Sequence, residues 1–376
     1  MPLEPRQRDW LAIRHTPGLG HRALDRLMAA YSGPEAVRSA TAEELKAGAG
    51  IPPGTAAALR RGEAEPALRA DECWAEAPGR TIQPRPEPGY PELLRKTDDP
   101  PPLLYIEGRP EALEEAPALA VVGSRSASRA GAREAFAFAR DLAGCGFTIV
   151  SGLARGIDAS AHRGALAGGG YTVAVQGCGP DRVYPAEHAE LAGEIAAQGA
   201  LVSEFPVGTP PRRANFPRRN RIVSGLSLGV LVVEAGERSG ALTTARWAGR
   251  QGREVFAIPG SIHSPLSRGP HRLIRDGAKL VETLADLVEE LPPPRRVPPE
   301  MAEPGAETET ALAGEQRIVA HCVDFHPTAL DQVVNRSGLT PDRVSAILLE
   351  LEILGVVAAE PGGFFIRTPA DGARGI

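Results

Sequence analysis

The chain between residues 118 and 291 repeats a short apolar run, a glycine-rich turn and a stretch with helical spacing. The six runs are LAVVGS, FTIVSG, YTVAVQG, ALVSEF, GVLVVEA and REVFAIPG. They are almost continuously apolar, as strands covered on both faces are, and a helix between successive strands requires parallel pairing. We expect these helices at residues 133–142, 157–166, 188–198, 242–250 and 284–290. The pattern therefore predicts an α/β fold with a doubly wound parallel sheet.

Composition limits the class of protein. A chain of 376 residues that is 42% hydrophobic is long enough for two or three globular domains. Its net charge of -5 argues against a protein that binds DNA over its whole surface, so a site for a polyanion has to be a local patch. The four cysteines show no CxxC spacing, which argues against zinc fingers and a disulfide scaffold. With no apolar leader and no run of about 18 apolar residues, we expect a cytoplasmic protein that has no membrane contact.

The turns that follow the apolar runs are rich in glycine and serine. In a parallel sheet they meet at the carboxyl edge, where helix N-termini bind anions. We expect VVGSRSAS, VSGLARGID, VQGCGPD and VEAGERSGALTT to offer free backbone amides to phosphate, with Arg125 and Arg155 in two of them. The last turn adds the donors of Ser239, Gly240, Thr243 and Thr244. The alternative is that these residues only form tight turns and helix caps; four such turns on one edge favour phosphate binding.

A basic segment, RRANFPRRNR at residues 212–221, places five arginines around Phe216 without an acid. Guanidinium groups fit phosphate oxygens, and an aromatic ring provides a face on which an unpaired base can stack. The alternative is a solvated charge run on the surface. The segment therefore predicts contact with single-stranded nucleic acid only in combination with the turns described above.

The motifs of several enzyme classes are missing. The sequence has no GxxxxGK[ST] and no GxGxxG after the first apolar run, which argues against a P-loop ATPase. GLSLG at residues 225–229 matches GxSxG, but its strand follows the serine instead of preceding it, so a serine hydrolase is not indicated. Asp158 and His162 share a helix face without a third metal ligand nearby, and we expect local structural roles for both.

The motifs VVGSR, SGLARGIDASAH, GCGPDRVYP, SEFP, NFPRRNRIVSGLS, VVEA, SGALTTA and VFAIPG occur in this order over roughly residues 88–291. This arrangement resembles the DprA/Smf family, DNA-processing protein A. The resemblance implies an extended Rossmann-type core that binds single-stranded DNA in a basic pocket and forms a homodimer. It also implies a mediator that loads the recombinase RecA on incoming DNA during natural transformation. We accordingly expect no enzymatic activity, no catalytic residue, no metal and no cofactor.

The resemblance also implies which residues line the DNA pocket, with Phe216 as the stacking platform and with Arg125 and Arg213 at its side. Together with the residues of the turns, the expected DNA-binding set is Gly123, Ser124, Arg125, Arg155, Gly156, Arg213, Asn215, Phe216, Arg218, Arg219, Asn220, Arg221, Ser239, Gly240 and Thr243.

Residues 1–85 contain two helix–glycine–helix passages and resemble the SAM-like or helix-hairpin-helix domain of the family. Gly18 and Gly20 either close tight turns or approach a phosphate backbone, and the sequence leaves both open. The Rossmann-type domain is expected at 86–291, a proline- and glutamate-rich linker at 292–311, and a tail at 369–376.

Residues 312–368 show three helical stretches followed by a β-ribbon, the order of a winged helix. Its third helix, DRVSAILLELE, carries more acids than bases and would repel phosphate. A protein-binding or structural role and direct duplex binding both stay open for this domain.

One competing function belongs to another class. A nucleotide-processing enzyme similar to the lysine-decarboxylase-like phosphoribohydrolases would use the same general sheet. Such enzymes carry PGGxGTxxE, which this sequence lacks. The shared architecture is then the only argument for that alternative.

Overall fold

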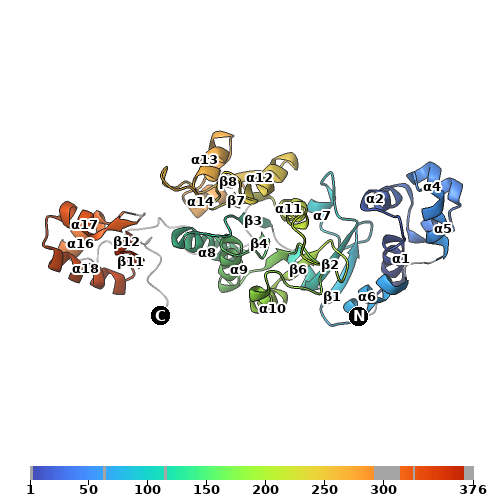
Figure 1. Ribbon diagram of the computed structural model, residues 1–376, viewed down its shortest axis with the longest axis horizontal. Helices are drawn as coiled ribbons and strands as arrows, with labels where there is room; N and C mark the ends of the chain where they lie inside the picture. The colour runs from blue at the N-terminus through green and yellow to red at the C-terminus, as the bar shows by residue number, and fades with distance from the viewer. Residues whose placement is uncertain (1–2, 62–64, 114–116, 292–313, 325–326, 368–376) are drawn as a thin grey trace. The chain divides into compact units, whose positions relative to one another are not determined.

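The computed structural model describes residues 3–61, 65–113, 117–291, 314–324 and 327–367. The chain divides into two units, Met1–Arg296 and Val297–Ile376, and Figure 1 shows the elements of each. The linker and tail expected at 292–311 and 369–376 lie outside the described residues.

A nine-stranded sheet organises the first unit, in the order β1-β2-β6-β5-β4-β3-β7-β8-β9. Its parallel strands are β3 (Ala118–Val122), β4 (Thr148–Ser151), β5 (Thr172–Val175), β6 (Ala200–Ser203), β7 (Gly229–Val232), β8 (Glu254–Ala257) and β9 (Lys279–Leu280). The six predicted strands are confirmed as β3 to β8. The antiparallel edge pair β1 (Arg80–Pro84) and β2 (Leu103–Gly108) was not expected.

The order of the parallel strands reverses at β3, which pairs with β4 on one side and with β7 on the other. Strands β4, β5 and β6 extend the sheet in one direction, and β7, β8 and β9 extend it in the other. This is the Rossmann-type arrangement, and it opens a crevice at the carboxyl ends of β3 and β7. The predicted fold class is confirmed.

Helices cover both faces of the sheet because alternate strand residues point to opposite sides. On β3, Leu119 and Val121 face the core shared with α8 and α9, whereas Ala120 and Val122 face the core shared with α11 and α12. The helices of this region are α7 (Glu92–Arg95), α8 (Arg129–Gly144), α9 (Ile157–Ala167), α10 (Ala189–Gln198), α11 (Asn215–Gly225), α12 (Ala241–Arg250), α13 (Arg268–Arg275) and α14 (Leu284–Val288), with 3-10 turns at η1 (Pro110–Leu113) and η2 (Ala186–His188).

In the described residues before the sheet there are six short helices: α1 (Pro5–Arg14), α2 (His21–Ala30), α3 (Pro34–Ser39), α4 (Ala42–Ala49), α5 (Pro53–Arg61) and α6 (Glu65–Ala75). Their core contains Trp10, Leu24 and Leu45, and it continues onto Leu103 and Tyr105 of β2. The helices and the sheet therefore share one core. A domain boundary after residue 85, as expected from the sequence, would place β1 and its pairing partner β2 in different domains.

The second unit is a winged helix. It consists of α16 (Gly314–Cys322), β10 (Thr328–Ala329), α17 (Leu330–Ser337), α18 (Pro341–Ile353), β11 (Val357–Glu360) and β12 (Phe364–Arg367). Its three-stranded sheet has the order β10-β12-β11, with β11 and β12 as the wing. In the described part of the chain, no helix combines the length and the apolar character needed to span a bilayer.

Candidate nucleic-acid interface

The Phe216 ring lies where three turns of the carboxyl edge meet. Phe216 belongs to the first turn of α11, and the Arg125 guanidinium, from the turn after β3, lies over its ring with Cζ 5.4 Å from the centroid. Tyr184, from the loop after β5, places its ring centroid 5.4 Å from that of Phe216 at an interplanar angle of 44°. Tyr184 is 48% exposed and Phe216 is half-buried, so aromatic surface is accessible beside an arginine. The predicted juxtaposition of Arg125 and Phe216 is thus present.

Gly177, in the turn after β5, supports the Phe216 ring. A Cβ atom at this position would lie 2.8 Å from Cδ1 of Phe216, closer than real side-chain contacts allow. The Asn215 side chain donates an Nδ2–H bond to the Gly177 carbonyl at 3.0 Å. The bare backbone of Gly177 and this hydrogen bond together position the first turn of α11, and with it the ring.

Within the described residues, three arginines near this ring form no ion pair. The side chains of Arg125, Arg212 and Arg213 are exposed, and none of them donates a hydrogen bond to another described residue. By contrast Arg155, which the sequence placed in the same set, is paired with Glu187 at 2.6 Å. An anion would have to displace Glu187 from Arg155, whereas the other three guanidinium groups are open to phosphate.

Arg219 is placed differently from the expectation. Its side chain is buried and donates from Nη1 to the carbonyls of Gly152 and Val175, at the ends of β4 and β5. Burial lowers the pKa of Arg219 to about 10, so the group is still charged at neutral pH. Arg219 ties α11 to the sheet and is not part of the surface that a ligand can reach.

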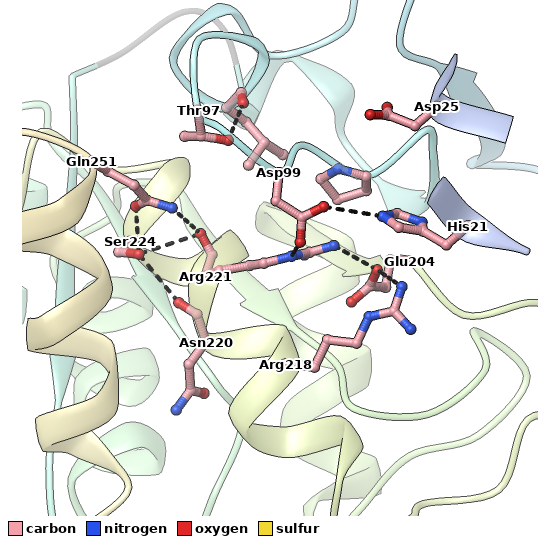
Figure 2. Close-up of polar contacts among 12 residues, drawn as sticks. His21, Asp25, Thr97, Asp99, Glu204, Arg218, Asn220, Arg221, Ser224 and Gln251 are labelled. Atoms are coloured by element: carbon pink, nitrogen blue, oxygen red, sulfur yellow. Dashed lines mark hydrogen bonds and ion pairs between the residues drawn. The ribbon is translucent and has the colours of Figure 1, made fainter. Parts of the chain in front are cut away.

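Arg221 is also buried, within a chain of ion pairs that Figure 2 shows. Its Nε donates to Asp99 at 2.9 Å and its Nη2 donates to Glu204 at 2.8 Å. Asp99 also contacts His21 of α2 at 3.3 Å, and Glu204 also accepts from Arg218 at 2.9 Å. Arg221 therefore joins α11 to the segment before β2 and to the end of β6, and we exclude it from the DNA contacts expected around Phe216. Arg218 is 42% exposed and can still reach solvent.

Two of the four turns do not offer the free amides that the sequence predicted. At the start of α8, the Glu234 carboxylate accepts the N–H of Ser128 at 2.9 Å and its hydroxyl at 2.6 Å. At the start of α9, Asp158 accepts the N–H groups of Gly152 at 3.2 Å and Ala154 at 3.3 Å. Carboxylates of the protein itself already accept the amides of Ser128, Gly152 and Ala154 in these two turns, so those amides are not free for a phosphate.

The candidate glycines of these turns have structural roles. Gly156 has φ +71°, and a Cβ atom there would lie 2.3 Å from the Ser124 carbonyl, which accepts the Ile157 N–H at 3.1 Å. A Cβ atom at Gly123 would lie 2.5 Å from Ile157. Gly123, Ser124 and Gly156 thus let the turns after β3 and β4 lie directly against each other.

The turn before α12 lies beside α11. Asn220 donates from Nδ2 to the Gly240 carbonyl at 3.3 Å, and Ser239 accepts the N–H of Ala241 at 3.3 Å. Thr243 follows in the first turn of α12 and is half-buried. Asn220 therefore joins α11 to the turn that contains Ser239 and Gly240 and leads to Thr243.

His162 takes the local role that the sequence predicted. Because Thr172 donates its hydroxyl to Ile149, His162 donates Nδ1–H to Thr172 at 2.7 Å. Burial lowers the pKa of His162 to about 3, so the imidazole is neutral. Groups of three or more residues able to hold a metal ion are absent from the described ranges.

The buried His162 predicts a dependence of stability on pH. Because its pKa in the folded chain, about 3, lies below the unfolded value of about 6.5, the free energy of unfolding falls as the pH drops through this range. We expect this group to contribute a loss of about 2 to 3 kcal/mol between about pH 7 and about pH 4.5. Urea unfolding of His162→Gln should show a pH dependence reduced by that amount. An unchanged pH dependence would contradict a neutral buried imidazole.

Comparison with known proteins gives the family. Residues 82–292 match the family model described as DNA recombination-mediator protein A, and residues 302–363 match the DprA winged helix domain. Protein Smf of Escherichia coli is 46% identical over 302 residues, which are 79% of this chain and 80% of that protein. The chain belongs to the DprA/Smf family.

Two solved DprA structures resemble this one. The X-ray structure of DprA from Streptococcus pneumoniae aligns with a TM-score of 0.68 at 33% identity, over 78% of this chain and 99% of that chain. A DprA structure from Helicobacter pylori, described as giving insight into a unique single-stranded DNA binding mode, aligns with a TM-score of 0.50 at 30% identity over 53% of this chain and 91% of that chain.

Sequence reasoning missed parts of this candidate site. Tyr184 and Gly177 contact or support the Phe216 ring, and both belong to the motif GCGPDRVYP. Their place in that motif was the signal available in the sequence. Asp99 had no such signal, because its partner Arg221 is 122 residues away in the chain.

Proposed function

We propose that this chain binds single-stranded DNA and acts as a recombination mediator that protects incoming strands and loads RecA during natural transformation. The observation that carries the proposal is the accessible Phe216 ring beside Arg125, with Arg212 and Arg213, which form no ion pair with a described residue, just before it in the chain. A strand offers bases for the ring and phosphates for the guanidinium groups. The name of the Helicobacter pylori relative supports the same ligand.

The geometry favours an unpaired strand over a duplex. Phe216 is half-buried against Gly177, so it presents a limited face that a splayed base can cover. Bases in a duplex are stacked on each other and do not offer that face. Arginines that contact only phosphate would not make this distinction.

Two further parts of the proposal concern protein partners. RecA loading and a homodimer through the Rossmann-type domain follow from the family, and we propose both for this chain. RecA-catalysed ATP hydrolysis on DNA coated with single-strand-binding protein provides a test, since a mediator should shorten its lag. Phe216→Ala should lose most of this effect. An unchanged lag, at a protein concentration that saturates the strand, would contradict the proposal.

We also propose that this chain is not an enzyme. A nucleotide-processing relative would need an anion site at the crevice between β3 and β7, and there the Glu234 carboxylate already binds Ser128, the residue before α8. This carboxylate would repel a nucleotide phosphate. Incubation with mononucleotides should yield no product, and release of ribose phosphate or free base would support the alternative.

For the winged helix we propose a protein contact. The exposed side of α18 carries Leu349 and Ile353, which are 60% and 76% exposed, and Arg343 of this helix is paired with Glu315 at 2.7 Å. Such a surface attracts an apolar partner more than a phosphate backbone.

Gly177→Ala should weaken strand binding without unfolding the protein. The new methyl group would lie 2.8 Å from the Phe216 ring and would push it from its position. We expect about tenfold weaker binding of oligo-dT, which equals about 1.4 kcal/mol and lies within the range for one stacked base. Gly193→Ala on α10, where nothing lies within 4 Å, is the matched control and should bind as the parent does. Equal affinities for both variants would show that the ring position is irrelevant.

A further inference from the structure

A groove of about 810 Å³ lies between the N-terminal helices and the core. Gly20, His21, Arg22 and Arg26 line it from the start of α2, and Pro217, Arg218 and Arg221 line it from α11. Trp247 of α12 completes the wall. Because Pro217 follows Phe216 directly, the groove begins one residue from the ring discussed above.

The lining of this groove is cationic. Four arginines and one carboxylate, Asp99, face it. Asp99 is already engaged by Arg221 and His21. Arg22 is exposed, and no ion pair or hydrogen bond of its guanidinium exists within the described residues. At least one full positive charge is therefore available to an anion.

Backbone donors point to the same kind of ligand. Helix α2 begins at His21, and the preceding Gly20 provides no side-chain cap, while the N–H groups of Ala23 and Leu24 bond to the Gly20 carbonyl. Within the described ranges the N–H groups of His21 and Arg22 have no acceptor. Such a helix start binds anions.

A buried donor supplies an independent observation. Arg221 lines the groove with a side chain that is only 2% exposed, and its Nη1 has no hydrogen-bond partner. A buried guanidinium N–H that lacks an acceptor costs free energy, and an acceptor on a bound ligand would remove that cost.

The groove also holds an aromatic side chain. Trp247 is half-buried, whereas the other two tryptophans, Trp10 and Trp74, are 0% and 5% exposed. Arg250 stacks on Trp247 with Cζ 5.5 Å from the ring centroid. An indole beside guanidinium groups is a surface on which a base can stack.

We propose that this groove is a second subsite for the same DNA strand, in which Arg22 and the start of α2 bind a phosphate and Trp247 stacks a base. The inference rests on the proposed function, since the strand reaches the groove from Phe216. It gives the N-terminal helices a direct part in strand binding.

Tryptophan fluorescence tests the subsite without any substitution, since Trp247 is the only tryptophan that is not buried. We expect an oligo-dT of about 12 nucleotides to quench this emission and one of about 4 to leave it unchanged. Trp247→Ala and Arg22→Ala should bind the long oligonucleotide about tenfold more weakly and the short one as the parent does. Trp247→Phe should keep most of the affinity. The matched control is Arg60→Ala, an exposed arginine on α5 outside the groove, and it should change neither.

The outcomes separate the two proposals. If Phe216→Ala weakens both oligonucleotides while Arg22→Ala and Trp247→Ala bind like the parent without quenching, the subsite is wrong and the proposed function stands. If the parent binds neither oligonucleotide, the proposed function itself fails. Parent-like thermal unfolding of each variant shows that weaker binding is not a loss of fold.

Discussion

Arg221→Ala should lower the free energy of unfolding by about 3 kcal/mol, the cost expected when one member of a buried ion pair is removed. The side chains of Arg221 and Glu204 are 2% and 1% exposed, and their contact is 2.8 Å. Removing the guanidinium would leave Glu204 inside the protein with Arg218 as its remaining ion-pair partner, and Asp99 would lose its bond as well. Urea unfolding at neutral pH measures the change.

Arg218→Ala is the matched control for Arg221→Ala. Arg218 contacts the same Glu204 carboxylate at 2.9 Å, but it is 42% exposed. We expect a loss of about 1 kcal/mol or less, because solvent screens this pair. Equal losses for the two variants, or a loss below about 1 kcal/mol for Arg221→Ala, would contradict the structural role assigned to Arg221.

Phe216→Ala should weaken the binding of oligo-dT by about 1 to 3 kcal/mol, the range measured for a base stacked on an aromatic ring. The ring is half-buried between Arg125, Tyr184 and Gly177, so its removal takes away the stacking face while the arginines stay. The change should appear in the dissociation constant from fluorescence anisotropy, and the salt dependence should be unaltered because no charge is lost.

Phe216→Tyr is the control for this prediction, since it keeps the ring and should keep most of the affinity. Thermal unfolding of Phe216→Ala should stay close to that of the parent, because the side chain is not part of the buried core. An affinity for oligo-dT equal to that of the parent would remove Phe216 from the site.

The sequence predicted the sheet well because its signal is local. Each of β3 to β8 is an apolar run followed by a turn and a helix, which any buried parallel strand requires. Strands β1 and β2 were missed because an antiparallel edge pair needs no crossover helix and leaves no such repeat. The topology then brings Arg125 and Phe216 together, as predicted.

The arginines of α11 show where sequence reasoning ends. Arg219 and Arg221 look like Arg212 and Arg213 in the sequence, but the helix turns the first two toward the core. Their acceptors, on Gly152, Val175, Asp99 and Glu204, come from distant parts of the chain. A charge run alone cannot tell a buried guanidinium from an exposed one, since only the tertiary fold supplies those acceptors.

The most direct test of the account compares oligo-dT with a duplex of equal length, each titrated by fluorescence anisotropy over a range of salt concentrations. We predict that the single strand binds at least about tenfold more tightly and that its affinity falls steeply with salt. Arg125→Ala and Arg213→Ala should each reduce the salt slope by about one. Equal affinity for strand and duplex, or an affinity that salt leaves unchanged, would contradict a site built from an accessible ring and unpaired arginines.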